Sequence, residues 1–241
     1  SGTGNTQWAA KTIAQSLGDR GWEVRLVSIE TVNEAELGAL IERTGVLGLG
    51  YPIYGSDMPE PIKELVKKMP DGNGKKAMVF CTQWQFSGDG AMVAGRELRR
   101  KGYDIRWTAH LNMPNNVCVT AMPLPYTADF EKHVPKLTRA RKQINRLVDH
   151  MVHDRSSRWP SCRMMGAMQR VPYRMLYKWF RNAPSLEKSR CIGCGRCARN
   201  CPAGNITMVG DLARFADRCV MCMRCVMLCP NGAVKAGLLE H

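Results

Sequence analysis

The chain has 241 residues, of which 44% are apolar, so it can bury a substantial core and is not a disordered polypeptide. Its formal net charge of +14 is compatible with an acidic protein, an anionic membrane surface or nucleic acid as a partner. No apolar stretch approaches the roughly 20 residues of a membrane-spanning helix, so no transmembrane segment is expected.

The first six residues, SGTGNT, precede a segment whose apolar residues recur at helical spacing. Glycines and hydroxyl side chains at the N-terminus of a helix can present N–H and O–H groups to an anion. Such runs are also common in flexible loops, and the dinucleotide fingerprint is not matched because a third glycine is lacking. We therefore interpret the run as a phosphate loop because of its position before the helix.

Residues 1–150 alternate between helical and strand patterns, which predicts βαβ units and a parallel sheet. In chain order, we expect a helix with Ala10, Ile13, Ala14 and Leu17 on one face; a strand at 22–29; a buried strand at 44–52; a helix from Pro61; a buried strand at 76–82; a helix from about Met92 to Gly102; a strand at 103–111; and a long helix carrying residues 130–147.

Residues 151–185 form a basic connector that we expect to be partly helical and interrupted by Pro172. From Lys136 to Arg190 there are 14 Lys and Arg against three acids, a local charge of +11. The segment places apolar residues on one helical stripe (Met164, Met168, Val171, Met175, Trp179) and basic residues on another (Arg163, Arg170, Arg174, Lys178, Arg181). Binding to a membrane or a partner is possible for such a helix, but we favour packing of the apolar stripe between domains.

Eight of the eleven cysteines fall in residues 186–238, in two runs of the form C-x2-C-x2-C-x3-C-P that repeat after 28 residues. Structural zinc sites use cysteine pairs, and a disulfide framework requires an oxidising compartment, so neither explains these runs. The spacing closely resembles that of bacterial two-cluster ferredoxins, which bind two [4Fe–4S] clusters. Because the fourth cysteine of each run binds the other cluster, we predict one cluster on Cys191, Cys194, Cys197 and Cys229 and the second on Cys219, Cys222, Cys225 and Cys201.

The N-terminal half resembles flavodoxins, in which a loop of the SGTGNT kind holds the phosphate of FMN. The segments GYPIYGSDMP and TQWQFSGDG each follow a predicted buried strand, where flavodoxins clasp the flavin ring. The resemblance implies that FMN is bound by three segments, made up of Ser1, Gly2, Thr3, Gly4, Asn5 and Thr6; Pro52, Ile53, Tyr54 and Gly55; and Thr82, Gln83, Trp84, Phe86, Ser87 and Gly88. Tyr51, Tyr54 and Trp84 are the aromatic candidates for contact with the ring. In MPNN (113–116), Asn115 or Asn116 could lie near the flavin, although a simple turn is an equal alternative.

The whole arrangement resembles the flavodoxin–ferredoxin fusion proteins of anaerobes. It implies an α/β, flavodoxin-like doubly wound parallel sheet followed by a C-terminal α+β two-cluster ferredoxin domain. A flavodoxin sheet has a central strand before its phosphate loop, so we expect further native residues before Ser1. The last three residues, Leu-Glu-His, look like the start of a tag and are set aside.

The expected function is electron transfer among FMN, two [4Fe–4S] clusters and an acidic redox protein, in the cytoplasm of an anaerobe. A flavin-dependent reductase of a small molecule, fed by its own clusters, is the alternative enzyme. A basic iron–sulfur scaffold that binds nucleic acid or membrane is a third reading. No catalytic acid–base pair is predicted, because Asp57 and Asp89 are more typical of loop or capping residues, and no groove-reading motif supports nucleic-acid binding.

Overall fold

The computed structural model describes residues 2–115, 129–180 and 184–236, without the side chains of residues 176 and 178–180. These residues form two compact units. The α/β unit contains Gly4–Pro114 and Asp129–Arg170, and the cysteine-rich unit contains the described residues from Val171 on together with Gly2, Thr3 and Asn115. The division falls within one helix, whereas the sequence predicted a separate connector at 151–185.

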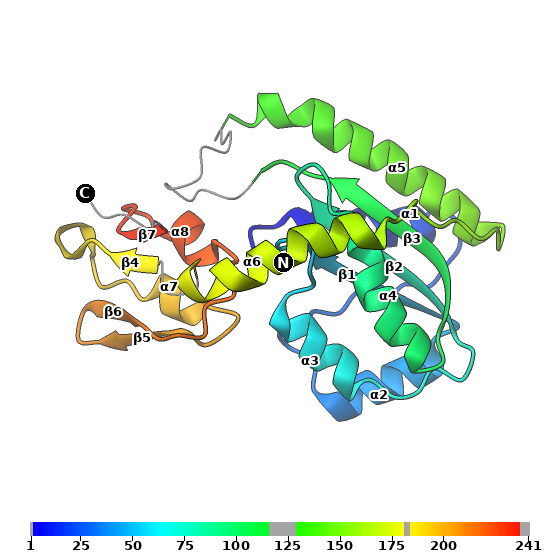
Figure 1. Cartoon of the computed structure of the whole chain (residues 1–241), viewed down its shortest axis with the longest axis horizontal. Coiled ribbons are helices and arrows are strands. Elements are labelled where there is room, and N and C mark those ends of the chain that lie inside the picture. Colours follow the sequence, from blue (N-terminus) through cyan, green and yellow to red (C-terminus); the bar gives the residue numbers. More distant parts are fainter. Residues whose placement is uncertain (1, 116–128, 181–183, 237–241) are drawn as a thin grey trace. The chain divides into compact units, whose positions relative to one another are not determined.

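The α/β unit is built on a three-stranded parallel sheet in the order β1-β2-β3, as the alternating pattern predicted (Figure 1). Its elements are α1 (Asn5–Gly18), α2 (Glu34–Arg43), β1 (Val46–Pro52), α3 (Glu60–Lys68), β2 (Lys76–Gln83), α4 (Gly90–Arg100), β3 (Asp104–Asn112), the 3-10 turn η1 (Glu131–His133), α5 (Val134–Val152) and the first half of α6 (Arg163–Phe180).

Side chains that alternate along the strands build a separate core on each face of this sheet. Val79 and Cys81 of β2 point into one core, which α3 and α4 cover with residues such as Ile62 and Leu98. Phe80 points into the other core, which α1 and α5 cover. The sheet is therefore covered by helices on both sides, and the predicted doubly wound α/β class is confirmed.

Two local predictions differ from the structure. Residues 22–28 are extended but form no strand, and Val24, Leu26 and Val27 are 38–50% exposed. The reason is that a strand needs a hydrogen-bonded neighbour, and the described part of the sheet offers this segment none. Helix α2 was missed, although Asn33 accepts a hydrogen bond from Glu36 N at 2.8 Å, in the capping arrangement that an Asn three residues before a Glu can signal.

Helix α6 runs from Arg163 to Phe180 and contains Pro172 in its interior. The expectation that Pro172 would interrupt the helix is therefore wrong. A proline removes one backbone N–H donor, a loss that a long helix can accommodate locally.

The cysteine-rich unit consists of short elements around the two cysteine runs. Besides the second half of α6, they are β4 (Pro184–Leu186), the 3-10 turn η2 (Lys188–Arg190), α7 (Arg196–Arg199), β5 (Ile206–Val209), β6 (Leu212–Phe215), α8 (Arg224–Leu228) and β7 (Val234–Ala236). β4 pairs with β7, and β5 pairs with β6, in both cases antiparallel. The two short helices α7 and α8 begin 28 residues apart, so the sequence repeat is also a structural repeat.

No helix in the described ranges is both long and apolar enough to cross a lipid bilayer.

Candidate functional site: two cysteine-lined cavities and a strand-end loop cluster

The carboxyl ends of all three strands meet the first turn of α1. Thr6 Oγ1 lies 2.8 Å from Thr82 Oγ1 at the end of β2, and both side chains are buried. Ile53 N donates to Thr82 O at 2.9 Å, which places the segment after β1 beside the same point. Asn5 Nδ2 donates to Pro114 O at 2.9 Å, just after β3. The structure thus brings together three segments that the sequence assigned to one flavin site.

The turn that opens α1 has a glycine at its N-cap position and no side-chain cap. Gly4, the N-cap of the helix, has φ 104°, a left-handed conformation that disfavours other residues. Glycine has no side-chain oxygen to cap the first-turn amides, so a bound anion can take that place. Gly2 and Thr3 immediately precede this turn and are half-buried, while Ser1 lies outside the described residues.

Pro52 ends β1 and leads into a tight turn that carries Tyr54 and Gly55. Tyr54 N donates to Asp57 O at 3.1 Å, and Asp57 N donates to Tyr54 O at 3.0 Å. The turn needs left-handed backbone at Gly55 (φ 55°) and at Ser56 (φ 60°). Tyr54 is half-buried beside this turn. Its contact with a flavin stays a prediction.

The aromatic candidates differ in their surroundings. Tyr51 is fully buried in the core, and its hydroxyl donates to Gly90 O at 2.7 Å, so it is a packing residue. Trp84 is half-buried, with the ammonium of Lys136 5.9 Å from its ring centre and donating to Trp84 O at 3.1 Å. Burial, helped by Arg139, lowers the pKa of Lys136. Phe86 is 51% exposed, which leaves its ring open to a ligand.

Ser87 belongs to a buried polar network that the sequence did not reveal. Its hydroxyl donates to Gln83 Oε1 and lies 3.4 Å from His110 Nδ1. His110 Nε2 accepts a hydrogen bond from Ala91 N at 3.0 Å, so the ring proton is on Nδ1, facing Ser87. Burial lowers the pKa of His110 to about 4, so the ring is neutral near pH 7. The network holds the segment after β2 against His110 of β3 and the first turn of α4.

A second missed feature joins this segment to helix α6. Asp89 is fully buried, and Arg170 Nη1 contacts its Oδ1 at 2.6 Å while Arg96 Nη2 contacts its Oδ2 at 2.6 Å. Burial raises the pKa of Asp89, but the two guanidinium groups outweigh it and hold the pKa below its usual value. Asp89 was expected to be a loop or capping residue, and no spacing in the sequence connects it to an arginine 81 residues away.

Close backbone packing accompanies this ion pair. A Cβ on Gly88 would lie 2.4 Å from Gly166 N, and one on Gly166 would lie 1.9 Å from Asp89 Oδ1. Only glycine fits at either position without displacement of the helix. Gly88 therefore has a packing role against α6, and its assignment to FMN stays a prediction. Asn115 is buried, and Asn116 lies outside the described residues.

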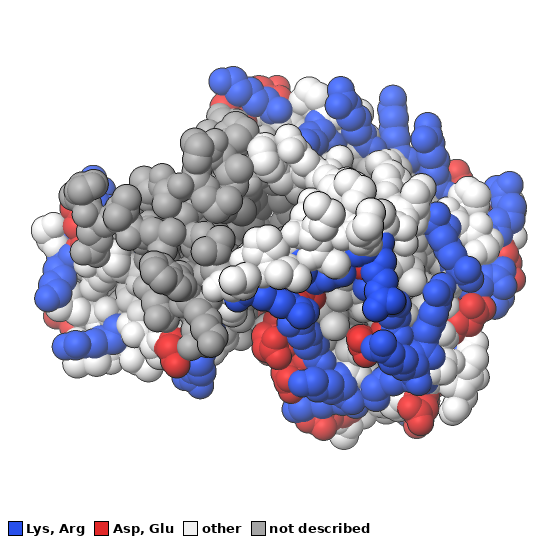
Figure 2. Space-filling view, in the orientation of Figure 1, with Lys and Arg blue, Asp and Glu red and all other residues white. Residues whose placement is uncertain are grey.

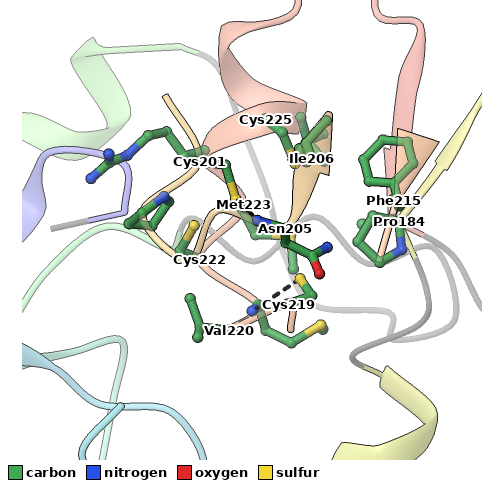
Figure 3. A pocket seen from close by; sticks show the side chains of 15 residues that line it. Pro184, Cys201, Asn205, Ile206, Phe215, Cys219, Val220, Cys222, Met223 and Cys225 are labelled. Carbon is green, nitrogen blue, oxygen red and sulfur yellow. Dashed lines mark hydrogen bonds between the residues drawn. The ribbon is translucent and has the colours of Figure 1, made fainter. Parts of the chain in front are cut away.

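In the cysteine-rich unit, two cavities are lined by the two predicted sets of cysteines. Cys191, Cys194, Cys197 and Cys229 line one cavity together with apolar residues such as Ile192 and Met208. The other is lined by Cys201, Cys219, Cys222 and Cys225, as Figure 3 shows. In each cavity, three cysteines come from one run and the fourth comes from the other run. The grouping agrees with the predicted sets, and iron binding by these cysteines stays a prediction.

Backbone N–H groups point at several of the sulfurs. Ala233 N lies 3.1 Å from Cys229 Sγ, Asn205 N lies 3.2 Å from Cys201 Sγ, and Met221 N lies 3.4 Å from Cys219 Sγ. Burial raises the pKa of Cys229, but several such amides outweigh it and the net pKa is lowered. Amides of this kind stabilise negative charge on a cluster and help to set its potential.

Burial disfavours the thiolate form of three cysteines in the second cavity. Burial, followed by the charges of Cys222 and Cys219, raises the pKa of Cys225 to about 12. Burial also raises the pKa of Cys219 and of Cys222. Iron would offset both the desolvation and the mutual repulsion, because metal binding releases the thiol protons.

Among the described residues, no group of three or more Cys, His, Asp or Glu is placed to hold a single metal ion. The ligands of a four-iron cube each bind a different iron, so they surround a cavity instead of meeting at one point. Four thiols around each of two cavities fit such a cube.

Comparison with known proteins assigns the cysteine-rich segment. Residues 190–233 match the family model of the 4Fe-4S dicluster domain. This match decides the class of metal site. The segment is a 4Fe-4S ferredoxin-type domain. No curated protein sequence gives a significant match to the chain.

The chain is also similar in structure to flavodoxins. A flavodoxin from the domain Archaea is 15% identical with a TM-score of 0.42, and the match covers 63% of this chain and 92% of that one. Two-electron reduced Megasphaera elsdenii flavodoxin is 23% identical with a TM-score of 0.41, covering 59% of this chain and 94% of that one. An NADH:FMN oxidoreductase in its apo form is 15% identical with a TM-score of 0.42, covering 64% and 83%. These scores are low, so the assignment of an α/β class rests on the sheet order and the helices on both faces.

Proposed function

We propose that this chain is an electron-transfer protein that holds FMN in the α/β unit and two [4Fe–4S] clusters in the cysteine-rich unit. The observation that carries the proposal is the division of eight cysteines between two cavities, four to each, with one exchanged in each direction. Bound flavin would exchange one or two electrons, whereas each cluster exchanges one. A chain with both can convert between two-electron and one-electron carriers.

The residues of the α/β unit have defined roles in this proposal. The first turn of α1, opened by Gly4, receives the phosphate, and the Thr6 hydroxyl donates to it. Tyr54, Trp84 and Phe86 flank the ring, and the Ser87–His110 network holds their segment in place. In the cysteine-rich unit, the thiolates bind iron and the backbone amides near them tune its charge.

Substitution of Thr6 tests the phosphate site. Thr6→Val keeps the shape of the side chain and removes the hydroxyl. We expect the dissociation constant of FMN to rise about tenfold to a hundredfold, because a hydrogen bond to a charged group is lost. Fluorescence quenching of free FMN on binding measures it.

Thr12→Val is the matched control, because Thr12 is a buried threonine of the same helix whose hydroxyl donates to Trp8 O at 2.9 Å. Equal affinities in Thr6→Val and the native chain would place the phosphate elsewhere.

We further propose that the electron donor or acceptor is an acidic redox protein, supported by the net charge of +14. Electron transfer to an acidic ferredoxin should slow steeply as salt is added. Turnover of a small molecule with a chemical reductant and no added protein would instead identify a reductase.

A further inference from the structure

A helix that packs on a hydrophobic core normally turns its apolar side toward the protein, whereas helix α6 contacts the α/β unit with its polar side. Its polar side faces the α/β unit, where Arg170 pairs with buried Asp89 and donates to Ser56 O at 2.8 Å. Gln169 bonds to Ser56 on the same side, and Gly166 lies against the backbone of Gly88. Contact with the protein is thus made by polar and small residues.

The apolar stripe of the same helix points to solvent. Met164, Met168, Val171 and Met175 are 70%, 68%, 59% and 72% exposed. Their spacing of four, three and four residues puts them within one narrow sector of the helix. The buried contact of α6 with the α/β unit is formed by Arg170, on the other side of the helix. Our expectation that the stripe packs between domains stays a prediction, because the division between the two units falls within this helix.

The charge around the stripe has a single sign. Between Asp154 and Glu187 the sequence contains seven Lys and Arg and no acidic residue. Arg163 and Arg174 are exposed and lie on the helix at the same flank of the stripe. Figure 2 shows an uncharged band over α6 with basic side chains along its edge.

From this combination we propose that α6 binds to the surface of an anionic lipid bilayer, with Met164, Met168, Val171 and Met175 entering the headgroup boundary. A helix that lies in such an interface needs an exposed apolar face with cations at its flank. Lipid adapts to flexible methionine side chains, and anionic headgroups complement the basic residues at the flank of the stripe. The inference goes beyond the proposed electron transfer and does not depend on it.

Vesicle flotation of the full chain, carrying its cofactors, tests the proposal. One set of vesicles is pure phosphatidylcholine, and a second contains about one third phosphatidylserine. We expect the native protein to bind the anionic vesicles and to be released by salt, with little binding to neutral ones.

The variant Met168→Glu with Met175→Glu should weaken binding to the anionic vesicles about tenfold or more, because two charges would have to enter the boundary. Leu26→Glu with Val209→Glu is the matched control, since both residues are about half exposed (50% and 56%), lie outside the stripe and receive the same charges. It should bind almost as well as the native chain.

Equal weakening in the two double variants would show that net charge alone drives binding, and would overturn the role of the stripe. Failure of the native protein to float with anionic vesicles would overturn the proposal outright, and would turn attention to a protein partner for this face. Because the substituted side chains are exposed, folding should persist, and the far-ultraviolet circular dichroism of each variant verifies it.

Discussion

The two units of this chain keep their folds by different means. The α/β unit buries apolar side chains on both faces of its sheet, in two extensive cores. The buried apolar residues described in the cysteine-rich unit are few and mostly small: Ile206, Ala213, Met223, Ala233, Val234 and Ala236. Only Met223 and Ala236 form a buried cluster there, with Met221 and Val226 packed against them. A unit of that size needs covalent or metal cross-links, and its eight cysteines provide them if iron is bound. The comparison teaches that the fold of the α/β unit depends on the periodicity of its apolar residues, whereas the fold of the cysteine-rich unit depends on the spacing of its cysteines.

Removal of iron should have the largest effect and should distinguish the two units most clearly. Anaerobic chelation is expected to unfold the cysteine-rich unit and to leave the α/β unit folded, because only the first depends on metal for its cross-links. Hydrogen exchange followed by mass spectrometry measures both units in one sample. Protection that persists in residues 191–236 of the iron-free chain would contradict this dependence.

Paired cysteine substitutions test whether the fourth cysteine of each run binds the cluster of the other run. Cys201→Ala with Cys219→Ala removes two ligands of the same predicted cluster, so about four of eight irons per chain should remain. Cys191→Ala with Cys201→Ala removes one ligand from each cluster, so nearly all iron should be lost. Iron analysis of anaerobically purified protein decides between them. The opposite order of iron contents would mean that each run holds its own cluster.

The buried ion pair tests the stability of the α/β unit. Arg170→Met leaves the fully buried Asp89 with Arg96 alone and should lower the free energy of unfolding by about 3 kcal/mol. Arg163→Met, at an exposed arginine of the same helix, should change it by less than about 0.5 kcal/mol. Chemical denaturation monitored by tryptophan fluorescence gives both values. Similar values for the two variants would show that the ion pair of Arg170 with Asp89 does not stabilise the α/β unit.

His110 should make the same unit sensitive to moderate acid. Its pKa is lowered from 6.5 to about 4, so the unfolded chain binds a proton that the folded chain does not between those values. Stability is therefore full above about pH 6.5 and falls as the pH drops toward 4, by at most about 3 kcal/mol.

The lowered pKa of Asp89 acts in a different window. Its contribution is present above an unfolded pKa of about 3.9 and is lost only below it. Melting temperatures from pH 7 to 4.5 should thus decline less in His110→Gln than in the native chain. His153→Gln, at an exposed histidine, should keep the native decline. Parallel curves for His110→Gln and the native chain would assign the decline to another group.

The smallest expected effect on stability concerns the turn at Gly193 in the first cysteine run. Gly193 has φ 66°, and a Cβ there would lie 3.0 Å from Asp211 Cβ. The equivalent position in the second copy is Met221, which accepts a side chain at φ 55°. Gly193→Ala should therefore cost about 1–2 kcal/mol, from backbone strain and contact together.

Gly210→Ala separates the two causes, because Gly210 has φ 58° but open space around it. Its cost should be about 1 kcal/mol, from strain alone. Thermal unfolding of the cysteine-rich unit measures both variants, and a larger loss in Gly210→Ala would exclude the contact with Asp211 as a cause.

The sequence predicted the parts of the molecule that depend on local pattern. Residues 44–52, 76–82 and 103–111 are strands within one or two residues, because apolar runs of that length are buried on both faces of a parallel sheet. The cysteine spacing predicted which four thiols would line each cavity, since the repeat limits what one loop can reach.

What the sequence could not predict depends on contacts between distant segments. Asp89 and Arg170 are 81 residues apart, and His110 meets Ser87 only after β2 and β3 pair. The outward direction of the α6 stripe follows from that ion pair, which no periodicity encodes. Residues 22–28 have a strand pattern, but pairing depends on a neighbour and not on the pattern alone.

The central proposal is that one chain carries both a flavin and two four-iron clusters and passes electrons among them. The most direct test is an anaerobic titration of the purified chain with a one-electron reductant, followed by absorbance and low-temperature electron paramagnetic resonance. We predict about eight irons and one FMN per chain, with the flavin bands bleaching as electrons enter through the clusters. About eight irons with no flavin, and none taken up from added FMN, would contradict the account.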